Sequence, residues 1–107
     1  MEYDIQIMAK SRSYQEELIK ALKNRKEATL YLNTALEESM RGDKESQELF
    51  LRALRNVAEA QGGLGKLAKK VHIRRENLYR ILSEEGNPEL NTFTTILSAM
   101  GFSLKVA

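Results

Sequence analysis

The segment from Leu64 to Ser83, LGKLAKKVHIRRENLYRILS, combines two helical stripes of apolar residues with basic side chains. Its first half places apolar residues at i, i+3, i+4 and i+7 of a short helix, namely Leu64, Leu67, Ala68 and Val71. Its second half carries an equivalent stripe of Leu78, Ile81 and Leu82. Only His72 and Ile73 remain for a tight turn, and the small side chain of Ala68 lets the two helices approach closely. This spacing predicts a helix-turn-helix, and therefore DNA binding.

Positive charge is concentrated in the same segment. Residues 63–82 hold six Lys or Arg side chains and one acidic residue, Glu76, whereas the whole chain of 107 residues has a formal net charge of only +2. A basic face on a nearly neutral protein is the electrostatic pattern expected of a phosphate-binding surface. A solvated helix surface is the alternative, because Lys and Arg are common on any exposed face. The coincidence with the apolar spacing favours DNA binding.

The second helix of such a motif presents its N-terminal residues to base edges in the major groove. On a helical wheel its outward side lies opposite Leu78, Ile81 and Leu82. An Arg can bind guanine O6 and N7, a Glu can accept from cytosine N4, and a Tyr can contact a thymine methyl group or a phosphate. The side chains predicted to form the DNA-binding face of this helix are Arg74, Arg75, Glu76, Asn77, Tyr79, Arg80 and Ser83.

Several candidates also have a purely structural interpretation. Glu76 can favour the positive end of the helix dipole, and Tyr79 can pack at the edge of the core. Asn77 lies to the side and suits a phosphate contact as well as a base contact. The lysines of the first helix contact phosphate or only solvent, and in either case carry no sequence information: Lys66, Lys69 and Lys70.

The composition predicts one globular domain. The chain has no Cys, no Trp, one Pro and 42% apolar residues, which argues against a disulfide scaffold and against a disordered chain. No apolar run approaches the length of a membrane span. The first residues include Glu2 and Asp4, where a signal peptide would carry positive charge. We therefore expect a cytoplasmic protein that joins the nucleoid when bound to DNA.

Catalytic and metal-binding patterns are absent from the sequence. His72 is the only His, there is no Cys, and no acidic calcium loop is present. The Gly-rich residues 62–65 are not preceded by an expected strand, so they indicate the end of a helix rather than a phosphate loop. We expect no catalytic residue, no cofactor and no metal site.

The helix signals of the first half predict an arm followed by a helical hairpin. Residues 1–12 lack a helical period and are expected to form an extended arm or a short strand. Ser13 with Glu16, and Asn24 with Glu27, have capping-box spacing. The first helix should bury Tyr14, Leu18, Ala21 and Leu22, and the second Ala28, Tyr31, Leu32, Ala35 and Leu36. The hairpin would span residues 13–41.

The second half should contain the helix-turn-helix core, residues 46–100. A helix from about residue 43 or 46 to 61 shows an apolar side made by Leu49, Phe50, Ala53, Leu54, Val57 and Ala58. Residues 86–88 predict a turn, and a last helix over 92–100 offers Phe93, Ile96, Leu97 and Met100 to the core. Residues 102–106 can form a short terminal strand. The expected fold is all-α, with five or six helices in a single domain over residues 13–107.

Two sets of residues carry a family resemblance. One comprises Leu67-Ala68, Val71, Ile73, Arg75, Leu78-Tyr79-Arg80, Leu82, Gly86-Asn87-Pro88 and Thr92; the other comprises Ala28, Tyr31-Leu32-Asn33, Ala35-Leu36-Glu37, Ala53-Leu54, Ala58, Ala60 and Gly62-Gly63. From about residue 13 to 106 the chain resembles the HigA-like antitoxins, addiction-module antidote proteins with a lambda-repressor-like (XRE-type) helix-turn-helix. The resemblance implies an antitoxin that neutralises a RelE-type (HigB) ribonuclease toxin and represses its own operon as a homodimer on an inverted repeat. A solitary phage-repressor-like regulator without a toxin is the alternative.

Two positions depart from the family pattern. His72 stands where the turn usually has Gly, and Arg74 stands where the second helix usually has a Ser or Asn cap. His tolerates a positive φ better than most residues, whereas a missing cap costs around 1 kcal/mol. The 13–41 hairpin is either a toxin-binding surface or purely structural. Residues 103–106 are candidates for pairing across a dimer axis.

Overall fold

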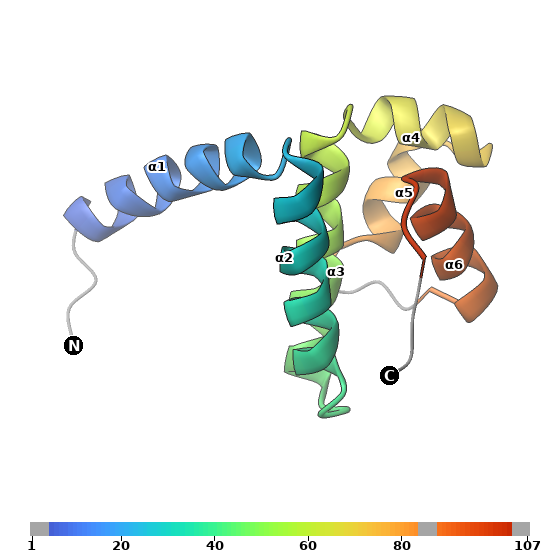
Figure 1. The fold of residues 1–107 in the computed structure, drawn as a ribbon, viewed down its shortest axis with the longest axis horizontal. Coiled ribbons are helices and arrows are strands. Elements are labelled where there is room, and N and C mark those ends of the chain that lie inside the picture. Colours follow the sequence, from blue (N-terminus) through green and yellow to red (C-terminus); the bar gives the residue numbers. More distant parts are fainter. Residues whose placement is uncertain (1–4, 84–87, 104–107) are drawn as a thin grey trace.

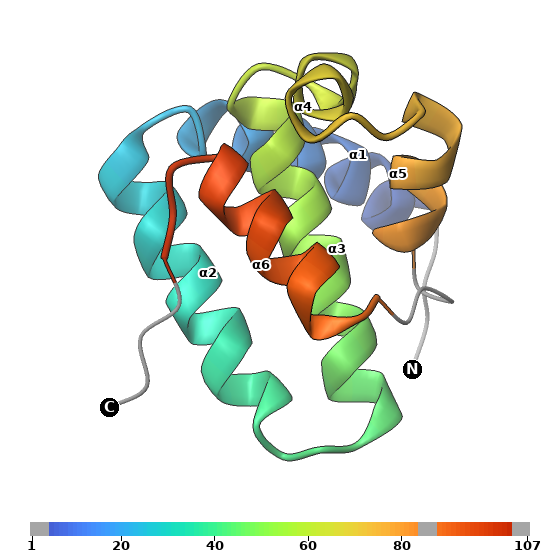
Figure 2. The same ribbon diagram turned by 90° about the vertical axis from the view of Figure 1, so that its right-hand side faces the viewer.

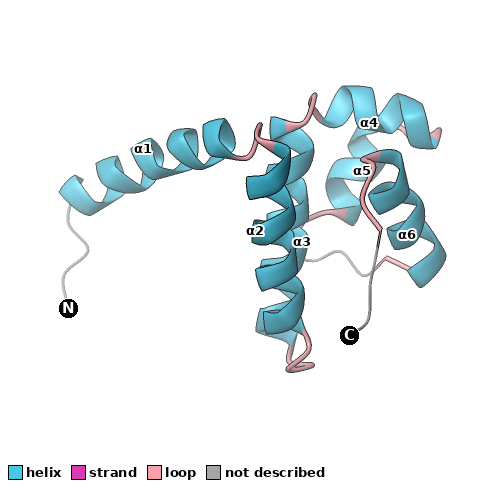
Figure 3. Ribbon diagram, in the orientation of Figure 1, coloured by secondary structure: helices cyan, strands magenta, loops and turns pink. Residues whose placement is uncertain are grey.

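The computed structural model describes residues 5–83 and 88–103, with side chains from Ser13 onward. This part of the chain contains six helices and no strand (Figures 1 and 3). The helices are α1 (Ile5–Ala21), α2 (Arg25–Ser39), α3 (Lys44–Ala60), α4 (Leu64–Val71), α5 (Arg75–Ile81) and α6 (Leu90–Ala99). The expected all-α fold with five or six helices is confirmed.

Helix α1 begins earlier than the capping signal predicts. It runs from Ile5, so residues 5–12 are helical rather than an extended arm, and Ser13 lies inside the helix. Gln6, Met8, Ala9 and Lys10 are good helix formers, and a capping box cannot begin a helix where the preceding residues already continue it. The expected burial is also partly wrong, because Tyr14 is 67% exposed and Ala21 is exposed, whereas Leu22 is buried.

The expected hairpin of residues 13–41 is replaced by a different pairing. Helix α2 lies along α3, while α1 runs across the end of this pair and projects to one side (Figures 1 and 2). The cause is the broad apolar surface of α3, which buries Phe50, Leu51, Leu54 and Val57 among others. A helix with so much apolar surface needs neighbours on several sides, whereas the buried residues of α2 are only Ala28 and Leu32.

The core surrounds α3 and joins all six helices. Phe50 of α3 stacks on Phe93 of α6, with ring centroids 5.2 Å apart and an interplanar angle of 8°. Leu49, which the spacing places in the core, is instead 48% exposed, and Leu51 is buried in its place. Asn56 is buried and accepts a hydrogen bond from Gln15 of α1 at 3.0 Å while donating to the Tyr31 hydroxyl of α2 at 3.1 Å.

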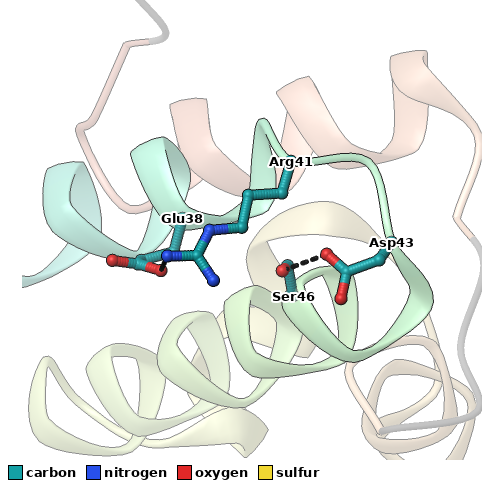
Figure 4. A network of polar contacts seen from close by, with 4 residues as sticks. All are labelled: Glu38, Arg41, Asp43 and Ser46. Carbon is teal, nitrogen blue, oxygen red and sulfur yellow. Dashed lines mark hydrogen bonds and ion pairs between the residues drawn. The ribbon is translucent and has the colours of Figure 1, made fainter.

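The two capping positions of α2 and α3 differ in detail. Asn24 accepts from the Glu27 backbone N–H at 3.1 Å, which confirms the predicted cap. Asp43 begins α3 but directs its carboxylate to the Ser46 hydroxyl, beside an ion pair of Arg41 and Glu38 at 3.3 Å (Figure 4). The hydrogen bond from the Ser46 hydroxyl is the main cause that lowers the pKa of Asp43 below its ordinary 3.8; backbone N–H groups and, least of all, the Arg41 charge act in the same direction, against a smaller effect of burial.

The last helix starts two residues before the expected position 92 and ends at Ala99. Ile96 and Leu97 are buried as predicted, and Phe93 and Met100 pack against the core. Of the expected terminal strand, Phe102 and Ser103 are not in a strand, and residues 104–106 lie outside the described part. The expected turn at 86–88 also falls largely outside it.

Candidate nucleic-acid interface

Two short helices, α4 and α5, form the predicted helix-turn-helix at one end of the molecule (Figure 2). Helix α4 buries Leu64, Leu67 and Ala68. Leu78 of α5 and the following Leu82 are completely buried. These side chains fix the orientation of α5 against α4 and the core, so the opposite side of α5 faces solvent.

The turn between the helices depends on His72. His72 has φ 57° and ψ 40°, the left-handed conformation, and it is the one non-glycine residue with positive φ in the described part of the chain. The Ile73 N–H donates to the Ala68 carbonyl at 3.1 Å, and the His72 N–H donates to the Lys69 carbonyl at 3.4 Å. This pair of bonds is the Schellman motif, which usually has glycine at this position.

The start of α5 has no side-chain cap. Arg74 adopts an extended conformation, with φ −61° and ψ 142°, and makes no capping hydrogen bond, as expected for a residue without a side-chain acceptor. Glu76 lies in the first turn, where its negative charge favours the positive end of the helix dipole.

The structure exposes most of the candidate residues together. The exposed members on α5 and its preceding residue are Arg74, Arg75, Glu76, Asn77, Tyr79 and Arg80. Ser83 differs, since it is half-buried and its hydroxyl donates to the Arg80 carbonyl at 2.7 Å. Ser83 therefore caps the end of α5 in this conformation.

Tyr79 is outward-facing rather than part of the core edge. Its side chain is 53% exposed, and the Arg55 guanidinium of α3 lies 5.6 Å from its ring centroid. Arg55 thereby brings a further positive charge to the α5 surface and holds the ring from one side. The sequence does not indicate that Arg55 belongs to this surface, because Arg55 is distant from α5 along the chain and nothing in the α3 pattern marks it.

The lysines of α4 occupy two different sides of that helix. Gly65 is on the α5 side, because a Cβ built there would lie 4.0 Å from the Arg75 Cδ. Lys66 turns back over Gly62, where a built Cβ would lie 3.1 Å from its Cδ, and lines a hollow with Lys70 beside the end of α6. Lys69, four residues after Gly65, is exposed and does not line that hollow. Lys66 is thus separated from the other candidates.

A second hollow, of about 420 Å³, lies between α1, α2 and α3. Its lining is mainly apolar and includes Leu18, Leu30, Tyr31 and Leu49. Leu30 is 55% exposed. Figure 1 places α1 on the side of the α2–α3 pair away from α4 and α5, so this hollow and the exposed face of α5 belong to different surfaces.

Residues 13–107 match the family described as "Probable addiction module antidote protein". The chain belongs to this family. The match covers both the helix-turn-helix and the preceding helices, so it extends over the whole helical core. An antidote implies a toxin, and this member of the family is accordingly an antitoxin with a toxin partner of some kind.

The chain is also similar to a Haemophilus influenzae (strain Rd) protein described as an uncharacterized protein. It is 34% identical over 85 residues, which cover 79% of this chain and 80% of the relative. No solved structure shows a significant match. None of the helices in the described residues is long and apolar enough to cross a membrane.

Proposed function

We propose that this antitoxin binds its own operator DNA through α5 and, as part of a type II module, neutralises a RelE-type (HigB) ribonuclease toxin. The observation that carries the DNA-binding part is the exposed basic face of α5 on a helix-turn-helix whose opposite side is locked into the core. The lambda-repressor-like (XRE-type) pattern of the sequence supports the same assignment. No catalytic role is proposed for the chain.

The position of each exposed side chain suggests a role. Arg75 and Arg80 read guanine, Glu76 accepts from cytosine N4, and Tyr79 contacts a thymine methyl group or a phosphate. The remaining exposed candidates position the protein on the DNA backbone rather than read its sequence: Lys69, Arg74 and Asn77. Two protomers on an inverted repeat would place two α5 helices in successive major grooves, about one helical turn apart.

Fluorescence anisotropy with the DNA upstream of the chain's own gene tests this part. Arg75→Ala and Arg80→Ala should each cost about 1–3 kcal/mol on the operator and much less on random DNA. Lys44→Ala, a change at an 88% exposed side chain at the start of α3, is the matched loss of one charge. Equal losses on operator and random DNA would reduce both arginines to phosphate contacts. Affinity that does not fall with added salt would contradict DNA binding altogether.

Toxin neutralisation requires a second surface, and we assign it to the apolar hollow between α1, α2 and α3. A hydrophobic toxin segment is the occupant proposed, because Leu30 and Leu49 are large apolar side chains left half-exposed there. The hollow lies away from α5, so one protomer can hold toxin and DNA together. Such an arrangement suits an antidote that represses its own operon.

Co-expression with the product of the adjacent small reading frame tests the toxin part. Growth should be rescued and the two proteins should co-purify. Leu30→Arg or Leu49→Arg should abolish both results while leaving operator binding intact, because each side chain is already exposed and its replacement leaves the core unchanged. If neither rescue nor a complex is seen with the natural chain, the product of that reading frame is not the toxin that this antitoxin neutralises. A complex that survives both substitutions would place the toxin elsewhere.

A further inference from the structure

Five helix termini meet at one junction, on the side of α4 away from α5. The Gln61 side-chain amide, at the end of α3, donates to the Leu22 carbonyl at 2.7 Å and to the Lys23 carbonyl at 3.3 Å, which lie at the end of α1. Arg25, at the start of α2, donates to the Met100 carbonyl at the end of α6, at 2.7 Å. Helix α4 begins beside them at Gly63.

These termini enclose a pocket of about 180 Å³. Arg25, Lys66 and Lys70 line it, and its other lining residues in the described part of the chain are all uncharged: Ala58, Gln61, Gly63, Leu67, Ala99 and Met100. Arg25 also stacks on Phe102, 3.9 Å from the ring centroid. In the described part of the chain, neither the ion pair of Arg41 with Glu38 nor that of Lys44 with Glu48 involves any of these three cations. Among the described residues, three positive charges therefore share one pocket and no carboxylate lines it.

Stabilisation of helix ends accounts for only part of this charge. A helix end carries roughly half an elementary charge, negative at the C-terminus and positive at the N-terminus. The partial charges at the junction therefore nearly cancel, because three ends are negative (the C-termini of α1, α3 and α6) and two are positive (the N-termini of α2 and α4). About two positive charges or more remain, which matches the charge of one phosphate group near neutral pH.

The start of α4 adds hydrogen-bond donors to this charge. Its capping residue is Gly63, which has no side chain to accept from the first backbone N–H groups of the helix. Those N–H groups have no partner within the helix, and free donors of this kind favour an anion. Lys66 and Lys70 come from the same helix, so cations and free donors are combined on one short element.

We propose that this pocket binds a phosphate group. The proposal is independent of the DNA-reading role assigned to α5, because the pocket lies on the other side of α4. The phosphate has two possible sources, a free phosphate or phosphomonoester and the backbone of bound DNA. Arg25, Lys66 and Lys70 would hold its oxygens by charge-assisted hydrogen bonds.

Amide chemical-shift titration of the full chain with inorganic phosphate tests the proposal, at ionic strength held constant with sodium chloride. The amides of residues 62–66 should shift together and saturate in the millimolar range. Lys66→Gln and Lys70→Gln should each weaken the apparent affinity about tenfold. Lys44→Gln removes the same charge from an 88% exposed side chain at the start of α3, outside the pocket, so its titration should match that of the natural chain.

Thermal unfolding in phosphate gives a second readout. Phosphate stabilises folded proteins in general, and that effect would raise Tm equally in all four proteins. Specific binding should add a further rise of a few degrees that Lys66→Gln and Lys70→Gln lose and Lys44→Gln keeps. Linear, non-saturating shifts, or Tm changes that are the same in every variant, would overturn the proposal and leave the three cations as stabilisers of helix ends.

Titration with a DNA duplex in phosphate-free buffer separates the two sources. If the backbone of DNA supplies the phosphate, the amides of residues 62–66 should shift with duplex, and prior saturation with inorganic phosphate should weaken duplex binding. If a free phosphate is the ligand, duplex should leave these amides unchanged while shifting those of α5, and inorganic phosphate should still saturate the pocket in the complex. A pocket that responds to neither ligand would refute the assignment.

Discussion

Replacing His72 by glycine should stabilise the protein, although His72 lies at the centre of its helix-turn-helix. The residue has φ 57° and an exposed side chain, so the change relieves backbone strain without removing any buried side-chain surface. Gly62 and Gly101 provide an internal comparison. They follow the ends of α3 and α6 with positive φ, and the next N–H bonds back to the helix at 2.9 Å in both cases.

The magnitude follows from two opposing terms. A left-handed conformation costs an L-residue roughly 1–2 kcal/mol, and His, which is enriched there, belongs at the lower end. The greater freedom of glycine in the unfolded chain offsets about 0.5 kcal/mol of the gain. His72→Gly should therefore stabilise by about 0.5 kcal/mol, whereas His72→Val, with a β-branched side chain, should destabilise by about 1–2 kcal/mol.

Urea unfolding followed by far-UV circular dichroism measures both changes. The two variants should move the midpoint in opposite directions at an unchanged slope, which shows that stability rather than compactness has changed. The reasoning is refuted if His72→Gly lowers the midpoint, because the imidazole would then contribute a contact that exceeds the strain. It is equally refuted if His72→Val unfolds at the same concentration of urea as the natural chain.

Four further substitutions test other parts of the structure. Gly101→Ala should destabilise the protein by about 2 kcal/mol in thermal unfolding, because φ is +82° and the new Cβ would lie 2.6 Å from a guanidinium nitrogen of Arg25. Gly42→Ala is the control, since Gly42 has φ +81° and nothing within 4 Å of a built Cβ. It should show only the backbone strain, about 1 kcal/mol. Ser46→Ala should raise the pKa of Asp43 toward 3.8 in a carboxyl NMR titration, and an unmoved pKa would exclude the hydroxyl as its cause. Because the folded pKa of Asp43 is the lower one, its carboxylate stabilises the native state above the unfolded pKa, and this stabilisation is lost as pH falls through the folded pKa. Asn56→Ala should cost about 2 kcal/mol in urea unfolding, since two side chains lose their partner, and a loss below 0.5 kcal/mol would show that water replaces it.

Local patterns in the sequence were sufficient to predict the helix-turn-helix. The apolar spacing predicted α4 and α5, the short gap between them predicted a tight turn, and Asn24 was recognised as a cap. Each of these depends on residues within about four positions of one another. The exposure of Tyr79 also follows from the helical wheel, because Leu78 anchors the opposite side.

Contacts between distant residues could not be predicted in the same way. The pairing of α2 with α3 depends on how much apolar surface α3 presents, which is a property of the assembled core. Arg55 reaches Tyr79 across 24 positions, and nothing near either residue indicates the contact. The lysines of α4 are evident from the sequence, but which of them face the pocket depends on where α6 packs against α4.

The contact between Arg25 and the Met100 carbonyl spans 75 positions of the 107-residue chain and closes most of its length into one loop. The Gln61 Oε1 accepts from the same guanidinium at 3.4 Å, and the Gln61 Nε2 donates to the Leu22 carbonyl at the end of α1. The early, middle and late parts of the chain therefore share one set of hydrogen bonds. Local opening at the start of α2 therefore releases the end of α6 as well. Amide hydrogen exchange at these two places should consequently report a single cooperative unit, in which the two halves of the antitoxin unfold together rather than in turn.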